Sequence, residues 1–279
     1  MSDKFQSTYT LPQGSHSGSF NMRGGLDSIW DLKYEFREVN KDGPVCVIVP
    51  GHRSRGIESE GNATVVDNVA AAGMSVLAFD YTGDQRTVKN VDPITMDSNI
   101  EDTKAVLELF GDRPHVMLAR SYGFSVGLSA ANDKTKGLIG ALPVADLYES
   151  MYQPYFDRKP FYMKWGFEAL MRTRGYYIWQ PKQKDYTKVD FVKITRPFVK
   201  SLDDHKLPKI FERQSNRFPI HLIANDEDHV ANVARTNTLA VELQAQGFDV
   251  KTEIVAGKSH ELSEESHEAV TRAIEAYTL

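Results

Sequence analysis

The stretch that decides the fold is His115-Val116-Met117-Leu118-Ala119-Arg120-Ser121-Tyr122-Gly123-Phe124-Ser125-Val126-Gly127-Leu128. It begins with a short apolar run typical of a β-strand and passes a serine in a turn. It ends in small and apolar residues that pack well as a helix. A strand, a sharp turn carrying a serine, and a helix are the layout of a nucleophile elbow. Such a turn needs small residues two positions either side of Ser121, and Ala119 and Gly123 occupy them. The usual pattern has glycine at both positions, so Ala119 departs from it by one methyl group. The alternative is a strand–turn–helix unit with an incidental serine.

The composition is that of a globular protein with a full hydrophobic core. The 279 residues are enough for one large domain or two small ones, and 41% are hydrophobic and 25% charged. The net charge of −5 at pH 7 gives no global indication of nucleic-acid binding.

The sequence favours a cytoplasmic protein. No apolar run approaches the roughly 18–20 residues needed to span a bilayer, and the first residues lack the layout of a secretory signal. Cys46 is the single cysteine, which excludes an intramolecular disulfide. It lies in the apolar run 45–49, so we expect a buried, unreactive thiol and a reducing compartment.

Strand-like and helix-like segments alternate from residue 45 to the end of the chain. Strands are predicted at 34–39, 45–49, 74–80, 115–119, 137–144, 220–224 and 250–255, the last as an edge strand. Helices are predicted at 58–72 up to Gly73, after a capping box at 98–101, after Ser121, at 233–246, and after a cap at Ser263. This alternation predicts an α/β fold with a mostly parallel, doubly wound sheet covered by helices on both faces.

We divide the chain into a flexible N-terminal arm, a core in two pieces and an insertion that caps the core. The arm, rich in Gly, Ser, Gln and Asn, covers residues 1–28. The core covers 29–149 and 216–279, and the cap covers 150–215. The cap holds 14 of the 29 aromatic residues, and 14 Lys or Arg against seven Asp or Glu, so it is basic while the rest of the chain is acidic.

The aromatic residues of the cap are candidates for substrate binding. Trp165 and Phe167 begin a run with helical spacing, and Tyr162 lies just before it. They form either a small core of the cap itself or an apolar acyl pocket under a positively charged rim. Such a rim suits an anionic substrate carrier, for example an acidic acyl carrier protein or a coenzyme A ester. No groove-reading motif or stacking sheet accompanies it, so we do not expect nucleic acid as a partner.

Candidate catalytic groups follow directly on the ends of predicted parallel strands. Ligand sites in such sheets lie beyond the carboxyl ends of the strands, and Ser121, Asp228, His260 and the loop 51–53 all occupy such positions. A serine hydroxyl needs a base within hydrogen-bond reach, and the base needs an acceptor that holds its tautomer. The chain order Ser, Asp, His is the order found with strand-elbow enzymes.

The base and the acid are chosen by their context. His260 lies in a loop after the last strand and just before the last helix, which makes it the strongest candidate among the eight histidines. Asp228 is preferred over Asp226 and Glu227 because a histidine and a valine follow it, in the D-x-V pattern usual for this loop. Asp146, after the preceding strand, is the reserve acid.

The oxyanion hole is expected where the elbow meets the Gly-rich loop after strand 45–49. Its donors should be the backbone N–H of Tyr122 and that of Arg53 or His52. His52 is also the main rival to His260 as base, or it shapes the turn alone. No metal-ligand spacing and no phosphate-binding glycine pattern is present, so we expect no cofactor.

These motifs together resemble the α/β-hydrolase superfamily over roughly residues 34–279. The matching segments are Pro50-Gly51-His52, Ala119-Arg120-Ser121-Tyr122-Gly123, Asn225-Asp226-Glu227-Asp228-His229-Val230 and Gly257-Lys258-Ser259-His260. Within that superfamily the chain is similar to the acyl-carrier-protein thioesterase, or acyl transferase, of bacterial bioluminescence. The shared features are the alanine at the first elbow position, the Asn-Asp-rich acid loop and the Gly-x-Ser-His-Glu-Leu segment. The resemblance implies acyl transfer through an acyl-serine, with water or another small nucleophile releasing the acyl group.

Three functions remain in competition from the sequence. The first is a serine acyl hydrolase for acyl thioesters or esters, and the second is a carboxylesterase or peptidase-like hydrolase of another acyl substrate. The third is a non-catalytic binding module that uses the same fold. A binding module does not need all three of Ser121, Asp228 and His260 at strand ends, which favours an enzyme.

Overall fold

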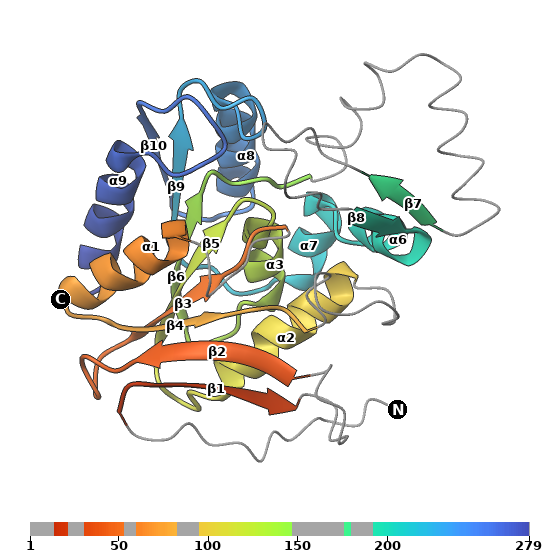
Figure 1. The fold of residues 1–279 in the computed structure, drawn as a ribbon. Coiled ribbons are helices and arrows are strands. Elements are labelled where there is room, and N and C mark those ends of the chain that lie inside the picture. Colours follow the sequence, from red (N-terminus) through yellow and green to blue (C-terminus); the bar gives the residue numbers. More distant parts are fainter. Residues whose placement is uncertain are drawn as a thin grey trace, which may run out of the picture.

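The structure is a computed structural model that describes residues 14–21, 31–52, 60–82, 95–146, 176–179 and 192–278. A central sheet of eight strands organises this part of the chain (Figure 1). Its strands are β1 (His16–Asn21), β2 (Asp31–Arg37), β3 (Val45–Val49), β4 (Ser75–Phe79), β5 (His115–Arg120), β6 (Thr135–Ala141), β9 (Ile220–Asn225) and β10 (Val250–Val255).

The strand order across the sheet is β1-β2-β4-β3-β5-β6-β9-β10. From β4 to β10 every neighbouring pair is parallel, and β2 pairs antiparallel with both β4 and β1. The prediction of a mostly parallel sheet with β10 at an edge is therefore confirmed. The crossovers place the carboxyl ends of β3, β5, β9 and β10 at one edge of the sheet, where ligand sites form.

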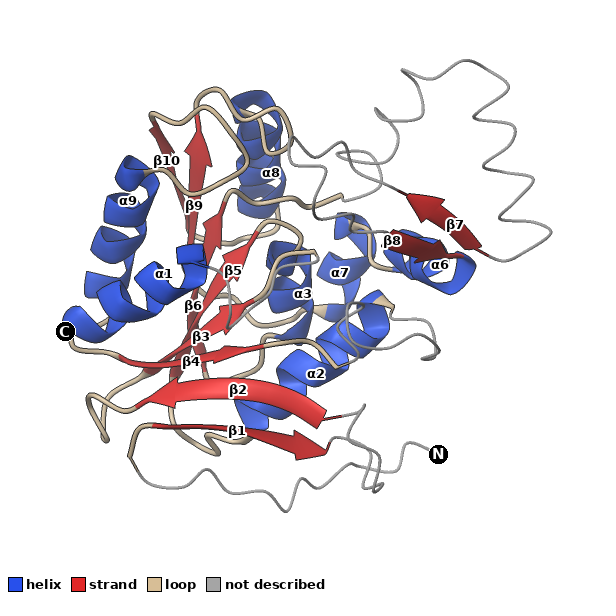
Figure 2. Ribbon diagram, in the orientation of Figure 1, coloured by secondary structure: helices blue, strands red, loops and turns tan. Residues whose placement is uncertain are grey.

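Helices cover both faces of the sheet (Figure 2). They are α1 (Glu60–Ala71), α2 (Met96–Glu108), α3 (Gly123–Ala130), α6 (Arg196–Asp204), α7 (Leu207–Arg213), α8 (Val233–Ala245) and α9 (Glu264–Glu275). Alternate residues of β5 enter two separate hydrophobic clusters. Val116 and Leu118 pack with residues of α1 and α9, whereas Met117 and Ala119 pack with residues of α2, α3 and α8. This two-sided burial is why the central strands are continuously apolar.

Cys46 lies in β3 and is fully buried, as its apolar surroundings predict. Burial raises the pKa of its thiol to about 12, so the reactive thiolate is not formed near neutral pH. Among the described residues, no helix is both long and apolar enough to cross a bilayer.

Strand β1 lies within residues 1–28, where the sequence predicted a flexible arm. It pairs with β2 from His16 to Asn21 along its whole length. Its polar, glycine-containing composition hides it from a pattern search, although its backbone pairs with β2 residue by residue. The ring of His16 also packs edge-on against Tyr34, with 5.4 Å between ring centroids.

Helix α2 begins three residues earlier than its predicted capping box. Thr95 is the N-cap, with an extended φ of −126°, and its side chain accepts the Ser98 backbone N–H at 3.1 Å. The Ser98 hydroxyl accepts the Thr95 backbone N–H at 2.9 Å, which completes the box. The sequence prediction gave Ser98 the cap position, whereas it is the third residue of the helix. A serine serves either role, so the pattern alone placed the start wrongly.

The described part of the segment 150–215 contains a hairpin and two helices. The hairpin pairs β7 (Tyr176–Trp179) with β8 (Val192–Thr195), and α6 and α7 follow it. Residues 147–175 and 180–191 lie outside the described residues, and the boundaries of the predicted cap stay a prediction.

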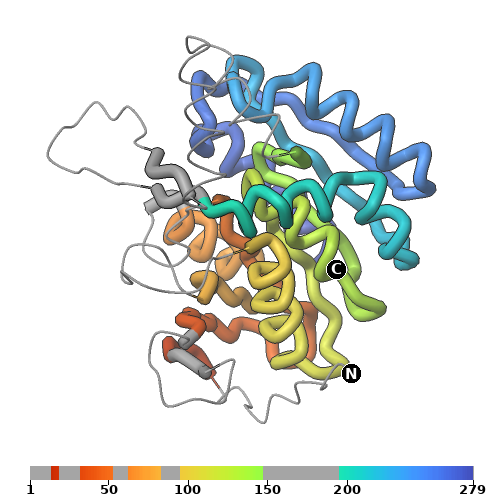
Figure 3. The backbone as a smooth tube through the Cα atoms, turned by 90° about the vertical axis from the view of Figure 1, so that its right-hand side faces the viewer, coloured from red at the N-terminus to blue at the C-terminus, as the bar shows by residue number. Residues whose placement is uncertain are grey.

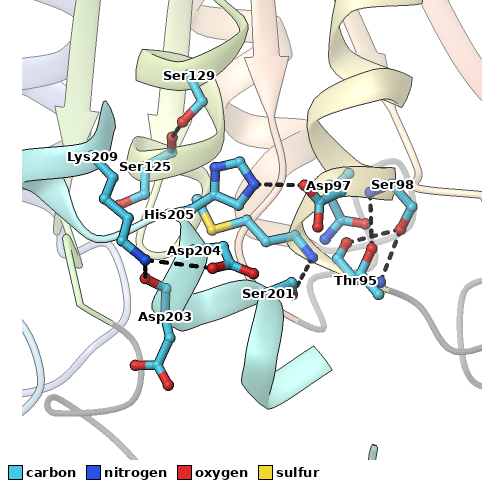
Figure 4. Close-up of polar contacts among 12 residues, drawn as sticks. Thr95, Asp97, Ser98, Ser125, Ser129, Ser201, Asp203, Asp204, His205 and Lys209 are labelled. Carbon is cyan, nitrogen blue, oxygen red and sulfur yellow. Dashed lines mark hydrogen bonds and ion pairs between the residues drawn. The ribbon is translucent and has the colours of Figure 1, made fainter. Parts of the chain in front are cut away.

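Helix α6 lies against α2 (Figure 3). The Ser201 hydroxyl accepts the buried backbone N–H of Met96, the first residue of α2, at 2.9 Å. Nearby, His205 Nε2 and Asp97 Oδ1 are 2.7 Å apart (Figure 4). Two polar contacts thus fasten the segment after β8 to the helix that flanks the elbow.

Candidate active site

Ser121 lies between the last residue of β5 and the first residue of α3, in a left-handed backbone conformation. Its φ is 53°, which costs a non-glycine residue on the order of 1–2 kcal/mol. Three backbone hydrogen bonds hold it there. Ser121 N–H donates to Ala141 O at 2.9 Å, and Ser121 O accepts from Phe124 N–H and Val144 N–H, both at 3.0 Å. The strain is therefore imposed by β6 and α3 together, and it places the serine at the tip of the turn.

The elbow is tight because α3 begins against the end of β3. A Cβ atom on Gly123 would lie 2.4 Å from the Pro50 carbonyl oxygen and 2.7 Å from that of Val49, so no side chain fits there. Ala119, on the other side of the turn, is fully buried. Its methyl group faces Gly127, and even a Cβ atom added there would lie 3.5 Å from the Ala119 Cβ, in ordinary van der Waals contact.

The structure brings Ser121, His260 and Asp228 together in one hydrogen-bonded line. His260 Nε2 lies 2.7 Å from Ser121 Oγ, and His260 Nδ1 lies 2.7 Å from Asp228 Oδ2. An ionised carboxylate only accepts hydrogen bonds, so Nδ1 carries the proton and Nε2 accepts the serine hydroxyl. The side chain of Asp228 is fully buried, whereas that of His260 is 23% exposed. The base is thus open to a substrate on one side and held by a carboxylate on the other.

Asp228 is stabilised as a carboxylate. Burial alone would raise its pKa, but the hydrogen bond and the charge of His260, with two backbone N–H groups, outweigh burial and lower the pKa. Those N–H groups belong to Val230 and Ala231, which donate to Oδ1 at 2.7 and 3.1 Å. With both oxygens engaged, the carboxylate keeps a fixed direction toward His260 Nδ1.

The described start of the loop after β3 lies beside the elbow. A Cβ atom on Gly51 would lie 3.3 Å from Arg120 O and 3.4 Å from Ser121 Cβ. Tyr122 is the N-cap of α3, and the first N–H groups of a helix point outward along its axis. These observations place the elbow amide and the loop next to the serine hydroxyl.

The His52 ring is occupied by aromatic contacts. It stacks on Phe198 of α6 with 5.2 Å between centroids and packs edge-on against Tyr122 at 5.6 Å. The base position next to Ser121 is held by His260, so the rival role of His52 as base has no support in the geometry. Arg53, the other candidate donor of this loop, lies outside the described residues.

The remaining sequence candidates are placed away from the histidine or are not described. Asp226 accepts the Gly257 backbone N–H at 2.9 Å, and Glu227 is exposed. Asp146, the reserve acid, follows β6, while the carboxylate on His260 belongs to Asp228. The predicted substrate-binding residues of the cap lie outside the described residues: Tyr162, Trp165 and Phe167.

Sequence reasoning missed two contacts that support the loop of His260. Asn225, at the end of β9, donates both amide hydrogens to carbonyl groups on either side of His260. Arg120 and Glu261 form an ion pair that joins the residue before Ser121 to the residue after His260. A polar residue at the end of an apolar strand was the available signal for Asn225, but its partners are about 35 residues away and no spacing rule reveals them. Within the described ranges, no three His, Cys, Asp or Glu side chains converge as metal ligands.

Comparison with known proteins identifies the fold. No protein-family model and no curated protein matches the sequence. Among solved structures, the chain is similar to the α/β hydrolase domain-containing protein 10 from mouse, with a TM-score of 0.67 at 18% identity, over 94% of this chain and 97% of that one. It is similar to a thermostable carboxyl esterase from Bacillus coagulans, with a TM-score of 0.67 at 19% identity, over 96% of this chain and all of that one. It is also similar to a monoacylglycerol lipase from Paleococcus ferrophilus, with a TM-score of 0.64 at 16% identity, over 88% of this chain and 99% of that one. With its strand order and its elbow, the chain has the α/β-hydrolase fold.

Proposed function

We propose that this protein is a serine hydrolase that cleaves carboxylic esters through an acyl-serine intermediate. The observation that carries the proposal is the His260 ring, which bridges Ser121 Oγ and Asp228 Oδ2 with 2.7 Å on each side. A histidine held in this way can take the serine proton at the moment of attack. The strained backbone of Ser121, with its φ of 53°, supports the same role because it presents the hydroxyl at the strand end.

In the acylation half of the reaction, Ser121 Oγ attacks the carbonyl carbon of the substrate. Its proton moves to His260 Nε2, while Asp228 stays ionised and stabilises the imidazolium. We expect the negative charge that forms on the carbonyl oxygen to be stabilised by the Tyr122 N–H and by a second backbone N–H from the start of the loop after β3, with His52 and Arg53 as the candidates from the sequence. One such donor typically stabilises the transition state by about 3–4 kcal/mol. His260 then gives the proton to the leaving oxygen or sulfur atom, and the acyl-serine remains.

In the deacylation half, water replaces the leaving group. His260 Nε2 takes a proton from the attacking water, and the acid product leaves when the proton returns to Ser121 Oγ. Another small nucleophile in place of water would make the protein an acyl transferase. Every proton that moves in the cycle passes through one nitrogen of His260.

The substrate class is proposed from two sources. Proteins of similar fold are named carboxyl esterase and monoacylglycerol lipase, which supports esters. The basic segment 150–215 favours an anionic acyl donor, such as a fatty-acyl thioester of coenzyme A or of an acidic acyl carrier protein. We therefore propose fatty-acyl esters and thioesters as the substrates.

Labelling with a fluorophosphonate tests the reaction type. The reagent should attach to Ser121 in the whole protein, as located by mass spectrometry, and Ser121→Ala should remove the label. His260→Ala should slow labelling by at least about 10³-fold, because the hydroxyl then lacks its base. A wild-type protein that takes no label at Ser121 would contradict the proposal and favour a binding module.

A substrate panel separates the acyl classes. We expect p-nitrophenyl esters and acyl-coenzyme A thioesters of increasing chain length to be hydrolysed, with higher kcat/KM for longer chains. Turnover of short esters without any thioester turnover would remove the thioester part of the proposal. Cleavage of peptide p-nitroanilides in preference to both would identify a peptidase-like hydrolase.

A further inference from the structure

The loop that carries His260 runs from the end of β10 to the start of α9. One backbone contact fastens it near its beginning, where Glu227 N–H donates to Gly257 O at 3.0 Å. His260 itself must keep its ring in line with Ser121 and Asp228, which lie on two other strand ends. Something must therefore fix the backbone of His260 as firmly as Asp228 fixes its ring.

A single side chain holds the backbone on both sides of His260. Asn225 is the last residue of β9 and is fully buried. Its Nδ2 donates to Ser259 O at 2.9 Å and to Glu261 O at 2.8 Å. These carbonyl groups belong to the residues immediately before and after His260. Both hydrogens of the amide are thus used, and they attach the loop to the central sheet.

The direction of the Asn225 amide is also fixed. Its Oδ1 accepts the Ser266 hydroxyl at 2.5 Å, and Ser266 is fully buried in the first turn of α9. The carbonyl groups of Ser259 and Glu261 can only accept, so the amide nitrogen must face them and Oδ1 is left to accept from the Ser266 hydroxyl. The loop also passes directly over the amide, since a Cβ atom on Gly257 would lie 2.4 Å from Asn225 Cγ.

We infer that Asn225 is a positioning residue that sets the place of His260 for proton transfer, with Ser266 orienting its amide. The inference rests on the proposed function, because it assigns a role in that reaction. Asn225 lies three residues before Asp228, so one strand end supplies both the carboxylate that holds the ring and the amide that holds the backbone. A shift of about 1 Å in a catalytic group can cost on the order of 10²-fold in rate. Loss of the amide should therefore act on the chemical step.

Two mirrored substitutions of neighbouring residues test the role. Asn225→Asp keeps the shape of the side chain but replaces the donating amide by an oxygen. Asp226→Asn makes the opposite change next to it and keeps the oxygen that accepts the Gly257 N–H. We expect N225D to lower both the rate constant of fluorophosphonate labelling and kcat for a p-nitrophenyl ester by about 10- to 100-fold, with KM within about threefold of wild type. D226N should stay within about twofold in all three.

Ser266→Ala is the second variant. It leaves Asn225 in place and removes the hydroxyl that orients the amide, which also lies 3.0 Å from the hydroxyl of Ser263, the N-cap of α9. We expect an intermediate loss in kcat with the same unchanged KM. The melting temperature of each variant is measured alongside. If N225D is unfolded at the assay temperature, the kcat of S266A decides.

The outcomes separate this inference from the proposed function. A folded N225D with a labelling rate within twofold of wild type would overturn the role of Asn225, while labelling of Ser121 would still support a serine hydrolase. Equal losses in N225D and D226N would also overturn it, because they would reflect a general disturbance of the loop. A wild-type protein that takes no label at Ser121 would contradict the proposed function itself.

Discussion

At Gly123, one added methyl group would collide with the backbone of β3. Gly123→Ala places a Cβ atom 2.4 Å from Pro50 O, and a carbonyl group in a central strand end cannot move aside cheaply. Overpacking of this kind costs about 1–3 kcal/mol. We expect urea unfolding to show that loss and fluorophosphonate labelling of Ser121 to slow by at least about 10-fold, because the elbow must open.

Gly127→Ala is the matched control in the same helix. The nearest atom to its new Cβ is the far end of the Leu138 side chain at 3.3 Å, which can adjust. Alanine also favours the helix by about 1 kcal/mol over glycine. Its free energy of unfolding should stay within about 1 kcal/mol of wild type. Equal behaviour of the two variants would show that the contact with β3 does not hold the turn.

The residues that meet at the site could be predicted where each follows a strand end. Ser121, Asp228 and His260 were placed by that rule, and the structure brings their side chains within hydrogen-bond distance. The role of Asn225 could not be predicted, because its amide binds two carbonyl groups, those of Ser259 and Glu261, that lie far along the chain. The stacking of His52 on Phe198 likewise depends on where the helix after β8 packs.

At the scale of elements, the attachment of α6 to α2 depends on one hydroxyl. Ser201 Oγ accepts the buried N–H of Met96, one of the N-terminal donors that a helix cannot satisfy itself. Ser201→Ala would leave that N–H buried without an acceptor, which costs about 1–3 kcal/mol. Urea unfolding should register this decrease.

Thr238→Ala is the control for that substitution. The Ser201 hydroxyl donates backward to a helix carbonyl, Phe198 O, at 2.7 Å. The Thr238 hydroxyl does the same to Ala234 O at 3.0 Å, but at an exposed position. Water replaces the lost contact, so the free energy of unfolding should change by no more than about 0.5 kcal/mol. A loss in S201A as small as that of T238A would mean that α6 is attached to α2 by its other contacts.

The elements themselves differ in how far the sequence determined them. Continuous apolar runs located the strands that are buried on both faces, such as β3 and β5. A strand buried in this way needs apolar side chains on both faces, so the run is visible in the sequence. Such runs did not locate β1, whose attachment to β2 is made by backbone groups that every residue possesses. The start of α2 was misplaced for a related reason, since Thr95 and Ser98 can each serve as a cap.

At the scale of the whole molecule, burial of histidines links stability to pH. His115 opens β5, is fully buried, and bonds through Nε2 to Thr135 Oγ1 at 3.0 Å. Burial lowers its pKa to about 4, outweighing the opposing effect of the nearby Arg113 backbone, which favours the protonated ring. The unfolded chain, with an ordinary histidine pKa near 6.5, therefore binds this proton more readily than the folded one. Stability from this group is present above pH 6.5 and is lost as the pH falls from there toward 4.

The size of the loss follows from the two pKa values. At pH 5, which is about 1.5 units below the pKa of an ordinary histidine, the unfolded chain is protonated at this residue, whereas the folded protein, with a pKa of about 4, is still mostly neutral. The free energy of unfolding therefore falls by about 2 kcal/mol between pH 7 and pH 5. His115→Gln removes the titrating group but retains a side-chain amide for the Thr135 hydroxyl. Its free energy of unfolding, measured in urea at both pH values, should fall by about 2 kcal/mol less than that of wild type over this interval. Identical pH slopes for wild type and H115Q would mean that the folded protein does not hold His115 in its neutral form.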